Sequence, residues 1–136
     1  MKMARIAVIL LLGILLLSGL ACGSSIKGTV ELPPGFQGVV EVEHEPGRVD
    51  TIFGEVFVVN GLIWNMGTER INFLYAIEFR DSRGRLLNRF EPDPTADLEF
   101  PNPPYWSLAP GEHERLFGDC YYYSRVASYK IILWKP

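Results

Sequence analysis

Cysteine and histidine are scarce in this chain of 136 residues, which has two of each. The two cysteines, Cys22 and Cys120, can form at most one disulfide, so a disulfide-stapled fold is excluded and stability has to come from a hydrophobic core. We expect Cys120 to be a small buried thiol on a strand. A reactive thiol is the alternative, but neither histidine lies in an obvious position to activate it.

Recognisable catalytic motifs are also absent. The sequence has no glycine-rich phosphate loop, no nucleophile elbow and no paired-cysteine zinc motif. A Ser-His-Asp group could be assembled on paper, but no local pattern nominates its members. We therefore expect a protein that is not an enzyme and has no cofactor beyond a covalent lipid. A small hydrolase with an unrecognised site is the alternative.

Metal-binding patterns are weak. His44 lies between two glutamates, but on a strand these neighbours point to the opposite face and cannot share an ion with it. His113, beside a Pro-Gly-Glu turn, is typical of an ordinary exposed residue. An acidic stretch offers weak calcium ligands in Glu91, Asp93, Asp97 and Glu99. Their spacing lacks the alternating acids and the glycine of a calcium loop, so we expect a solvated loop and no metal.

A hydrophobic run occupies the N-terminal part of the chain. Lys2 and Arg5 precede an almost unbroken apolar run over 6–17, and the small residues over 18–21 lead directly into Cys22. This is the layout of a secretory signal. The cysteine at its end resembles the lipobox of bacterial lipoproteins, whose processing enzyme cuts before a cysteine that carries diacylglycerol.

The pattern predicts a lipoprotein signal peptide over 1–21, the lipidated Cys22 with a short tether over 22–28, and one domain over 29–136. Two alternatives stay open: ordinary signal peptidase would release a soluble protein, and an uncleaved run over 6–26 is just long enough to span a bilayer. We expect the protein at the cell membrane, held by its lipid on the extracytoplasmic side. The pattern does not distinguish the inner from the outer membrane.

Positive charge is in short supply once the signal is removed. The mature chain of 115 residues would have 11 basic and 16 acidic side chains, a net charge of −5. Such a chain has no overall electrostatic attraction for phosphate backbones or anionic lipids. Nucleic-acid binding is disfavoured. Membrane attachment would rest on acyl chains, in which each buried CH₂ contributes about 0.8 kcal/mol.

Two long strands form the centre of the sequence. Apolar residues alternate over 71–79, placing Ile71, Phe73, Tyr75, Ile77 and Phe79 on one face. Asn60-Gly61 is a strong hairpin signal, but a turn there would leave a very short strand. We therefore place the turn at 65–69 and expect strand 55–64 to pair with strand 71–79. Gly61 would then leave room for a neighbour on the face of Phe57, Val59 and Ile63.

Shorter elements surround this centre. We expect a loop over 29–38, an edge strand over 39–45 that Pro46-Gly47 ends, and a turn at 81–84 leading to a return strand over 85–90. A long, proline-rich surface loop over 91–107, a turn at 108–112 and strands over 113–120 and 128–134 complete the chain. These elements predict an all-β fold: an immunoglobulin-like antiparallel β-sandwich of about seven strands with Greek-key connections, after a cleaved helical signal peptide.

Four spaced motifs resemble the FxLYD family of immunoglobulin-like domains, which are common in bacterial surface lipoproteins. The motifs are Val59-x-Gly61-x-Ile63-x-Asn65-x-Gly67, Phe79-Arg80-Asp81-x-x-Gly84, Leu108-Ala109-Pro110-Gly111-Glu112 and Ala127-Ser128-Tyr129. The resemblance covers about 55–134. The chain departs from it where no aromatic precedes Asp81 and where the insert over 91–107 is long. The resemblance implies a fold and no activity.

Aromatic side chains are the candidates for partner contact. Tyr105 and Trp106 end the proline-rich loop, and Tyr122 is the middle residue of a tyrosine triplet. These three could form a contact patch. The favoured alternative is that Phe100, Tyr105 and Trp106 fold back and cap one end of the sandwich. Strand alternation would turn Tyr122 away from the face shared by its two neighbours.

The sequence thus predicts a lipid-anchored, non-enzymatic protein of the cell envelope that acts as a binding or interaction module. Its expected partners are the membrane, through the lipid on Cys22, and a protein or glycan of the envelope. The alternative function is an accessory or substrate-delivery lipoprotein subunit of an envelope enzyme or transporter.

Overall fold

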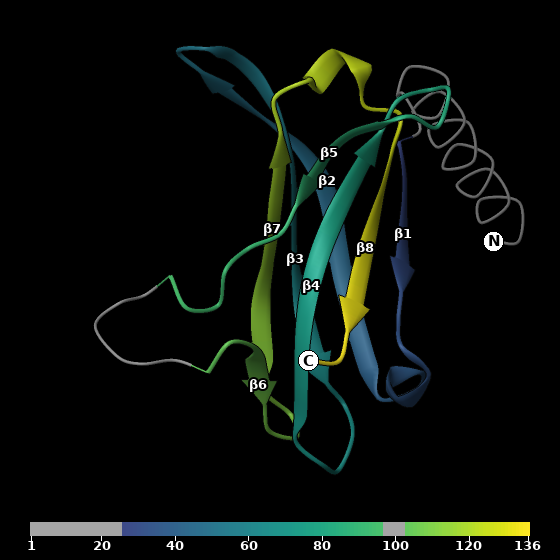
Figure 1. Cartoon of the computed structure of the whole chain (residues 1–136), viewed down its shortest axis with the longest axis vertical. Coiled ribbons are helices and arrows are strands. Elements are labelled where there is room, and N and C mark those ends of the chain that lie inside the picture. Colours follow the sequence, from purple (N-terminus) through teal and green to yellow (C-terminus); the bar gives the residue numbers. More distant parts are fainter. Residues whose placement is uncertain (1–25, 97–102) are drawn as a thin grey trace, which may run out of the picture.

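The computed structural model describes residues 26–96 and 103–136, which form a sandwich of two β-sheets (Figure 1). One sheet has the order β1-β8-β4-β5, with β6 also paired to β4, and the other has the order β2-β3-β7. The strands are β1 (Lys27–Glu31), β2 (Val40–Thr51), β3 (Gly54–Asn65), β4 (Ile71–Arg80), β5 (Leu86–Phe90), β6 (Trp106–Leu108), β7 (His113–Cys120) and β8 (Ser128–Trp134). The 3₁₀-helices are η1 (Pro34–Phe36) and η2 (Tyr123–Arg125). The predicted all-β sandwich is confirmed.

The core follows from the alternation seen in the sequence. Every second residue of β4, from Ile71 to Phe79, is buried against the facing sheet. That sheet contributes Phe57, Val59 and Ile63 from β3, all at most 1% exposed. The Phe57 and Phe79 rings meet edge to face across the two layers, with centroids 5.7 Å apart, a geometry that aromatic pairs favour.

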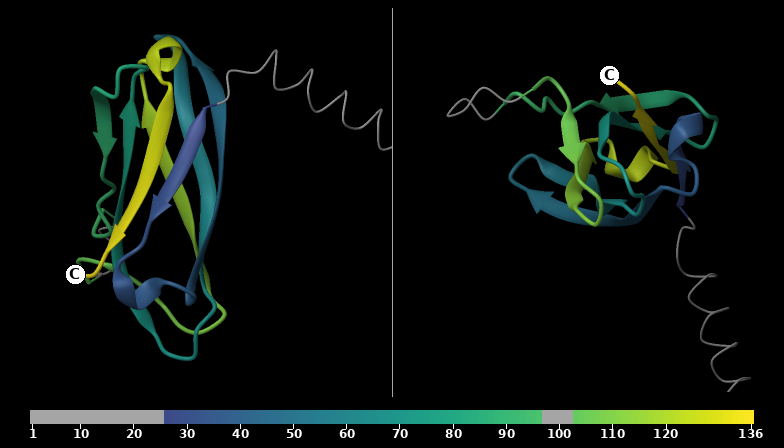
Figure 2. Two further views of the ribbon diagram at one scale, coloured as in Figure 1. Left: turned by 90° about the vertical axis from the view of Figure 1, so that its right-hand side faces the viewer. Right: turned by 90° about the horizontal axis from the view of Figure 1, so that it is seen from below.

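The turn between β3 and β4 lies where we predicted it. The predicted pairing of these two strands is wrong. β3 runs unbroken to Asn65, so no hairpin forms at Asn60-Gly61. β3 pairs with β2 and β7, and β4 pairs with β8, β5 and β6. Figure 2 shows the two layers, with β3 in one and β4 in the other. Each of these strands has a strongly apolar face, and placing them in opposite sheets lets the two faces bury one another.

Gly61 has the role that we expected of it. A Cβ atom at this position would overlap the backbone carbonyl of Glu43 on β2. The absence of a side chain therefore allows β2 to approach β3 at the middle of the hairpin that these two strands form.

Three boundaries differ from prediction. We expected a loop over 29–38, but residues 29–31 belong to β1 (Lys27–Glu31), which pairs in parallel with β8. Pro46-Gly47 does not end β2, which continues to Thr51. Because β2 is an edge strand, the missing N–H of Pro46 leaves the sheet intact. The tail of the proline-rich loop forms β6, which pairs with β4.

Candidate interaction surfaces

The sandwich has two ends that present different chemistry. We call one the hairpin end: it contains the start of β1 at Lys27, the β2–β3 tip at Ile52-Phe53, the turn over 81–85 and η2. The strand registers bring these together, because Lys27 pairs with Ser128, which also pairs with Arg80. We call the other the pocket end: it contains η1, the β3–β4 turn over 66–70, the turn over 109–112 and Lys135. Figure 1 shows the two ends at opposite poles of the strands.

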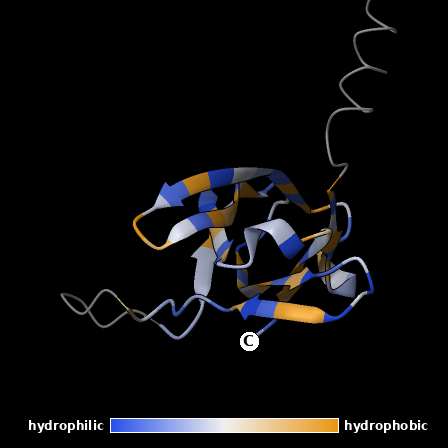
Figure 3. Ribbon diagram, turned by 90° about the horizontal axis from the view of Figure 1, so that it is seen from above, coloured by the Kyte–Doolittle hydropathy of each residue, from blue (hydrophilic) through white to orange (hydrophobic). Residues whose placement is uncertain are grey.

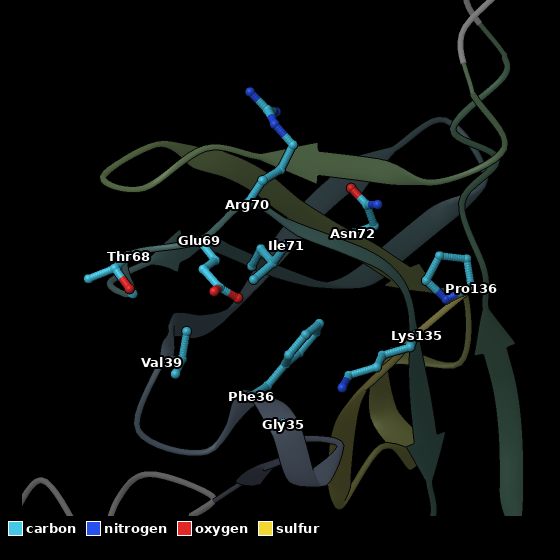
Figure 4. Close-up of a pocket in the computed structure, with 11 residues that line it drawn as sticks. Gly35, Phe36, Val39, Thr68, Glu69, Arg70, Ile71, Asn72, Lys135 and Pro136 are labelled. Atoms are coloured by element: carbon cyan, nitrogen blue, oxygen red, sulfur yellow. The ribbon is translucent and has the colours of Figure 1, made fainter.

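The pocket end holds an open hollow of about 560 Å³. Its apolar wall comes from Phe36 of η1, Val39 and Ile71. Figure 4 shows Glu69 and Lys135 pointing into this space from two sides, whereas Arg70 points away from it. The Lys135 ammonium lies 5.6 Å from the centroid of the Phe36 ring, a cation–π contact.

The chemistry of this hollow suits a small polar ligand or a polar segment of a partner. Its volume lies within the range of ligand pockets, roughly 300–1,000 Å³. The carboxylate of Glu69 can accept hydrogen bonds, and the ammonium of Lys135 can donate them. A ligand with a hydrogen-bond donor on the Glu69 side and an acceptor on the Lys135 side would match these two groups.

Asn65 holds the turn that carries Glu69. Its side chain is fully buried, and its amide nitrogen donates to the carbonyl oxygens of Glu69 at 2.8 Å and Leu108 at 3.0 Å. Its side-chain oxygen accepts from the backbone N–H of Gly67 at 3.0 Å. The backbone N–H of Gly111 donates to the Asn65 carbonyl at 2.7 Å. One residue therefore joins two turns of the pocket end.

The hairpin end exposes apolar surface instead. Ile52 is 93% exposed and Phe53 is 86% exposed. They lie at the tip of the β2–β3 hairpin, where Gly54 to Val56 pair with β2 but not with β7. Figure 3 shows this apolar tip projecting from the body of the sandwich. We did not predict this feature, and its signal was two adjacent apolar residues before Gly54 in a segment that turns.

Aromatic and basic side chains lie at the same end. Tyr121 and Tyr122 are exposed, and the Arg125 guanidinium lies 5.6 Å from the centroid of the Tyr122 ring. The predicted alternation of the tyrosine triplet is wrong, because β7 ends at Cys120 and η2 begins at Tyr123. Only Tyr123 of the triplet packs against the core, where its ring lies 6.0 Å from that of Phe57.

Asp81 shapes the turn beside them. Its carboxylate accepts hydrogen bonds from the backbone N–H groups of Arg85 and Arg83, each at 2.9 Å, and from Nε of Arg85 at 3.0 Å. These bonds hold the pKa of Asp81 below its ordinary value, and the bond from the Arg85 backbone has the largest effect. Gly84 completes the turn with a φ of 78°. The predicted turn is confirmed.

The three aromatic residues predicted as partner contacts do not form one patch. Trp106 is half-buried and packs on Phe73 and Tyr75, at ring distances of 6.1 and 5.0 Å. Tyr105 precedes it and is also half-buried, whereas Tyr122 lies at the hairpin end. Trp106 therefore belongs to the packing of β4, as the capping alternative expected. Phe100 lies outside the described residues.

The residues weighed as metal ligands have other contacts. Nδ1 of His44 lies 2.7 Å from the hydroxyl of Tyr129, and the His113 ring packs on Trp64 at 4.4 Å. Asp93 accepts from the hydroxyl and backbone N–H of Thr95, which lowers its pKa. Asp97 and Glu99 lie outside the described residues. Within 26–96 and 103–136, no three His, Cys, Asp or Glu side chains are placed to hold an ion.

Cys120 is fully buried at the end of β7, and the prediction of a buried strand thiol is confirmed. Burial raises the pKa of this thiol, which keeps it in the weakly nucleophilic protonated form. Cys22 lies outside the described residues. In the part of the chain that the structure describes, no helix has the length and hydrophobicity needed to cross a bilayer.

A scan against known families found no match, and a search of curated proteins found none either. Among solved structures, the chain is similar to the crystal structure of Campylobacter jejuni cj0090, with 13% sequence identity and a TM-score of 0.42. The alignment covers 81% of this chain and 98% of that one.

Proposed function

We propose that this chain is a lipid-anchored, non-enzymatic binding module of the cell envelope. The signal-like segment over 1–21 and Cys22 would fix it to a membrane, and the β-sandwich would present a binding surface. The FxLYD domains that the sequence resembles are common in bacterial surface lipoproteins, which supports the proposed location and not the activity. The partner would be a protein or a glycan of the envelope.

One observation carries this proposal: the first described strand begins at the hairpin end, and the hollow lies at the opposite pole. Lys27, which opens β1, is only five residues from Cys22 in the sequence. Anchoring at Cys22 would therefore place the hairpin end beside the membrane. The hollow between Glu69 and Lys135 would then face away from the membrane, where a partner can reach it.

The test is crosslinking in living cells, followed by affinity capture of the tagged protein and mass spectrometry. A Lys135→Glu variant should lose the captured partner, because the charge on one side of the hollow is reversed. Lys130→Glu is the matched control: it makes the same charge change on β8, outside the residues that line the hollow. Equal capture by both variants would remove the hollow from the proposal.

A Cys22→Ser variant tests the anchor in the same experiment. The proposal expects this variant to leave the membrane fraction. A protein of full-length mass that still fractionates with membranes would instead be held by an uncleaved span over 6–26. A single partner recovered in near-equal amount, and only with the anchored form, would favour the accessory subunit of an envelope complex over a free binding module.

A further inference from the structure

The Ile52-Phe53 tip is an apolar surface whose position restricts what can cover it. These are the two most exposed large hydrophobic side chains of the described residues, and Val49 on the same hairpin is 47% exposed. No core contact requires them, because the tip extends beyond the point where β7 stops pairing with β3. Exposed apolar groups of this kind mark sites of protein or membrane contact.

The short segment between Cys22 and Lys27 indicates that the tip contacts a membrane and not a protein. Residues 23–26 separate Cys22 from Lys27, and an extended chain spans at most about 3.6 Å per residue. Acyl chains on Cys22 would therefore hold the start of β1 within about 18 Å of the bilayer surface. Lys27 lies at the hairpin end, so the tip lies at the end that faces the lipid.

The side chains around the tip match a membrane interface. Tyr121 and Tyr122 are exposed at the same end, where they lie near Glu55 of the same hairpin. Tyrosine is enriched where bilayers meet water. The basic side chains of Arg83 and Arg125 are exposed at the same end and can reach lipid phosphates while their stems lie on apolar surface. On the hairpin itself Asp50 and Glu55 flank the tip, and Arg48 forms ion pairs with both, so the charges beside the tip are mixed.

We propose that the Ile52-Phe53 tip inserts into the headgroup region of the bilayer that holds Cys22, as a second membrane contact. This inference rests on the proposed lipid anchor for the placement of the domain. With two contacts the sandwich cannot rotate freely about its tether. The pocket end is then held facing away from the lipid.

Site-specific photo-crosslinking tests the inference in the full chain, in its own membrane. Benzoylphenylalanine is incorporated at position 53 in one sample and at position 66 in the other. Met66 is the matched control, because it is also a large apolar residue, 59% exposed, but lies at the pocket end. After irradiation, the purified protein is analysed by mass spectrometry for lipid adducts.

We expect several-fold more lipid adduct at position 53 than at position 66. Equal adduct at the two positions, or a protein adduct in place of lipid at position 53, would overturn the inference. The mass of the peptide containing Cys22 is read from the same sample. An acylated Cys22 without lipid adduct at 53 refutes the tip contact alone, whereas an unmodified Cys22 with lipid adduct at 53 refutes the anchor alone.

Discussion

The hairpin end and the pocket end of this sandwich are built in opposite ways. At the pocket end a buried asparagine, Asn65, makes hydrogen bonds to two turns, and the apolar Phe36 beneath the hollow is covered. At the hairpin end the side-chain hydrogen bonds of the tip are local: the Thr51 hydroxyl donates to the carbonyl of Gly54 and accepts from the backbone N–H of Phe53. Under the proposed function, the pocket end would be a fixed surface for a partner, and the tip would be an apolar surface for lipid.

β2 and β3, which carry the tip, are paired along their whole length, and Gly61→Ala should disturb that pairing. Its new Cβ would overlap the Glu43 carbonyl, so β2 would have to move, at an expected cost of about 3 kcal/mol in the free energy of unfolding. Urea denaturation measures this. Gly47→Ala, on the same strand pair, meets only the side chain of Val58 at 3.3 Å and should cost much less.

Asn65→Ala should loosen the pocket end. The change leaves the Leu108 carbonyl without its donor inside the protein, which is expected to cost about 2 kcal/mol of stability. Asn60→Ala, on the same strand, is the control, since Asn60 is only half-buried. Hydrogen exchange of the Gly67 amide should increase in Asn65→Ala, because this amide donates to the side-chain oxygen of Asn65. Unchanged exchange at Gly67 would contradict the role given to Asn65.

Asp81 makes the turn at the hairpin end sensitive to acid. Its pKa is lower in the folded protein than its ordinary value of 3.8, so the carboxylate stabilises the fold above about pH 4. This contribution is lost as the pH falls through the folded-state pKa. Urea midpoints measured from pH 7 to pH 2.5 should therefore fall less steeply with acid in Asp81→Asn than in the wild type. Parallel profiles would show that Asp81 does not contribute.

The smallest effect on stability is expected at the tip itself. Ile52→Ser with Phe53→Ser removes no buried contact, so the free energy of unfolding should change by less than about 0.5 kcal/mol. Phe57→Ser, four residues further along the same hairpin, empties a fully buried site and should destabilise the fold severely. A clear loss of stability in the tip variant would mean that the tip packs against the protein.

Strands were predictable here because their alternation is local. The faces of β4 and β8 and the extent of β7 follow directly from the order of apolar and polar residues. Sheet membership did not follow, because two strands with strong apolar faces can pair side by side or stack across a core. The sequence pattern alone does not distinguish these arrangements.

The candidate interaction surfaces were predicted less well than the strands, and the physical reason is different for each surface. Trp106 was weighed as a contact residue, yet its ring is used in packing against Tyr75 on β4, a contact distant in sequence. The apolar tip was missed because turns are ordinarily built from polar residues, glycine and proline. The hollow was missed because Phe36, Glu69 and Lys135 come from three separate segments that only the fold brings together.

The orientation of the domain on a membrane tests the proposed anchor and tip contact most directly. Single dye labels are placed through Ile52→Cys or Met66→Cys on the purified protein in vesicles that contain an acceptor lipid, since Cys120 is buried and Cys22 would be acylated. Energy transfer to the membrane should be strong from position 52 at the hairpin end and weak from position 66 at the pocket end. Equal transfer from both positions, or stronger transfer from position 66, would contradict the assignment of the hairpin end to the membrane.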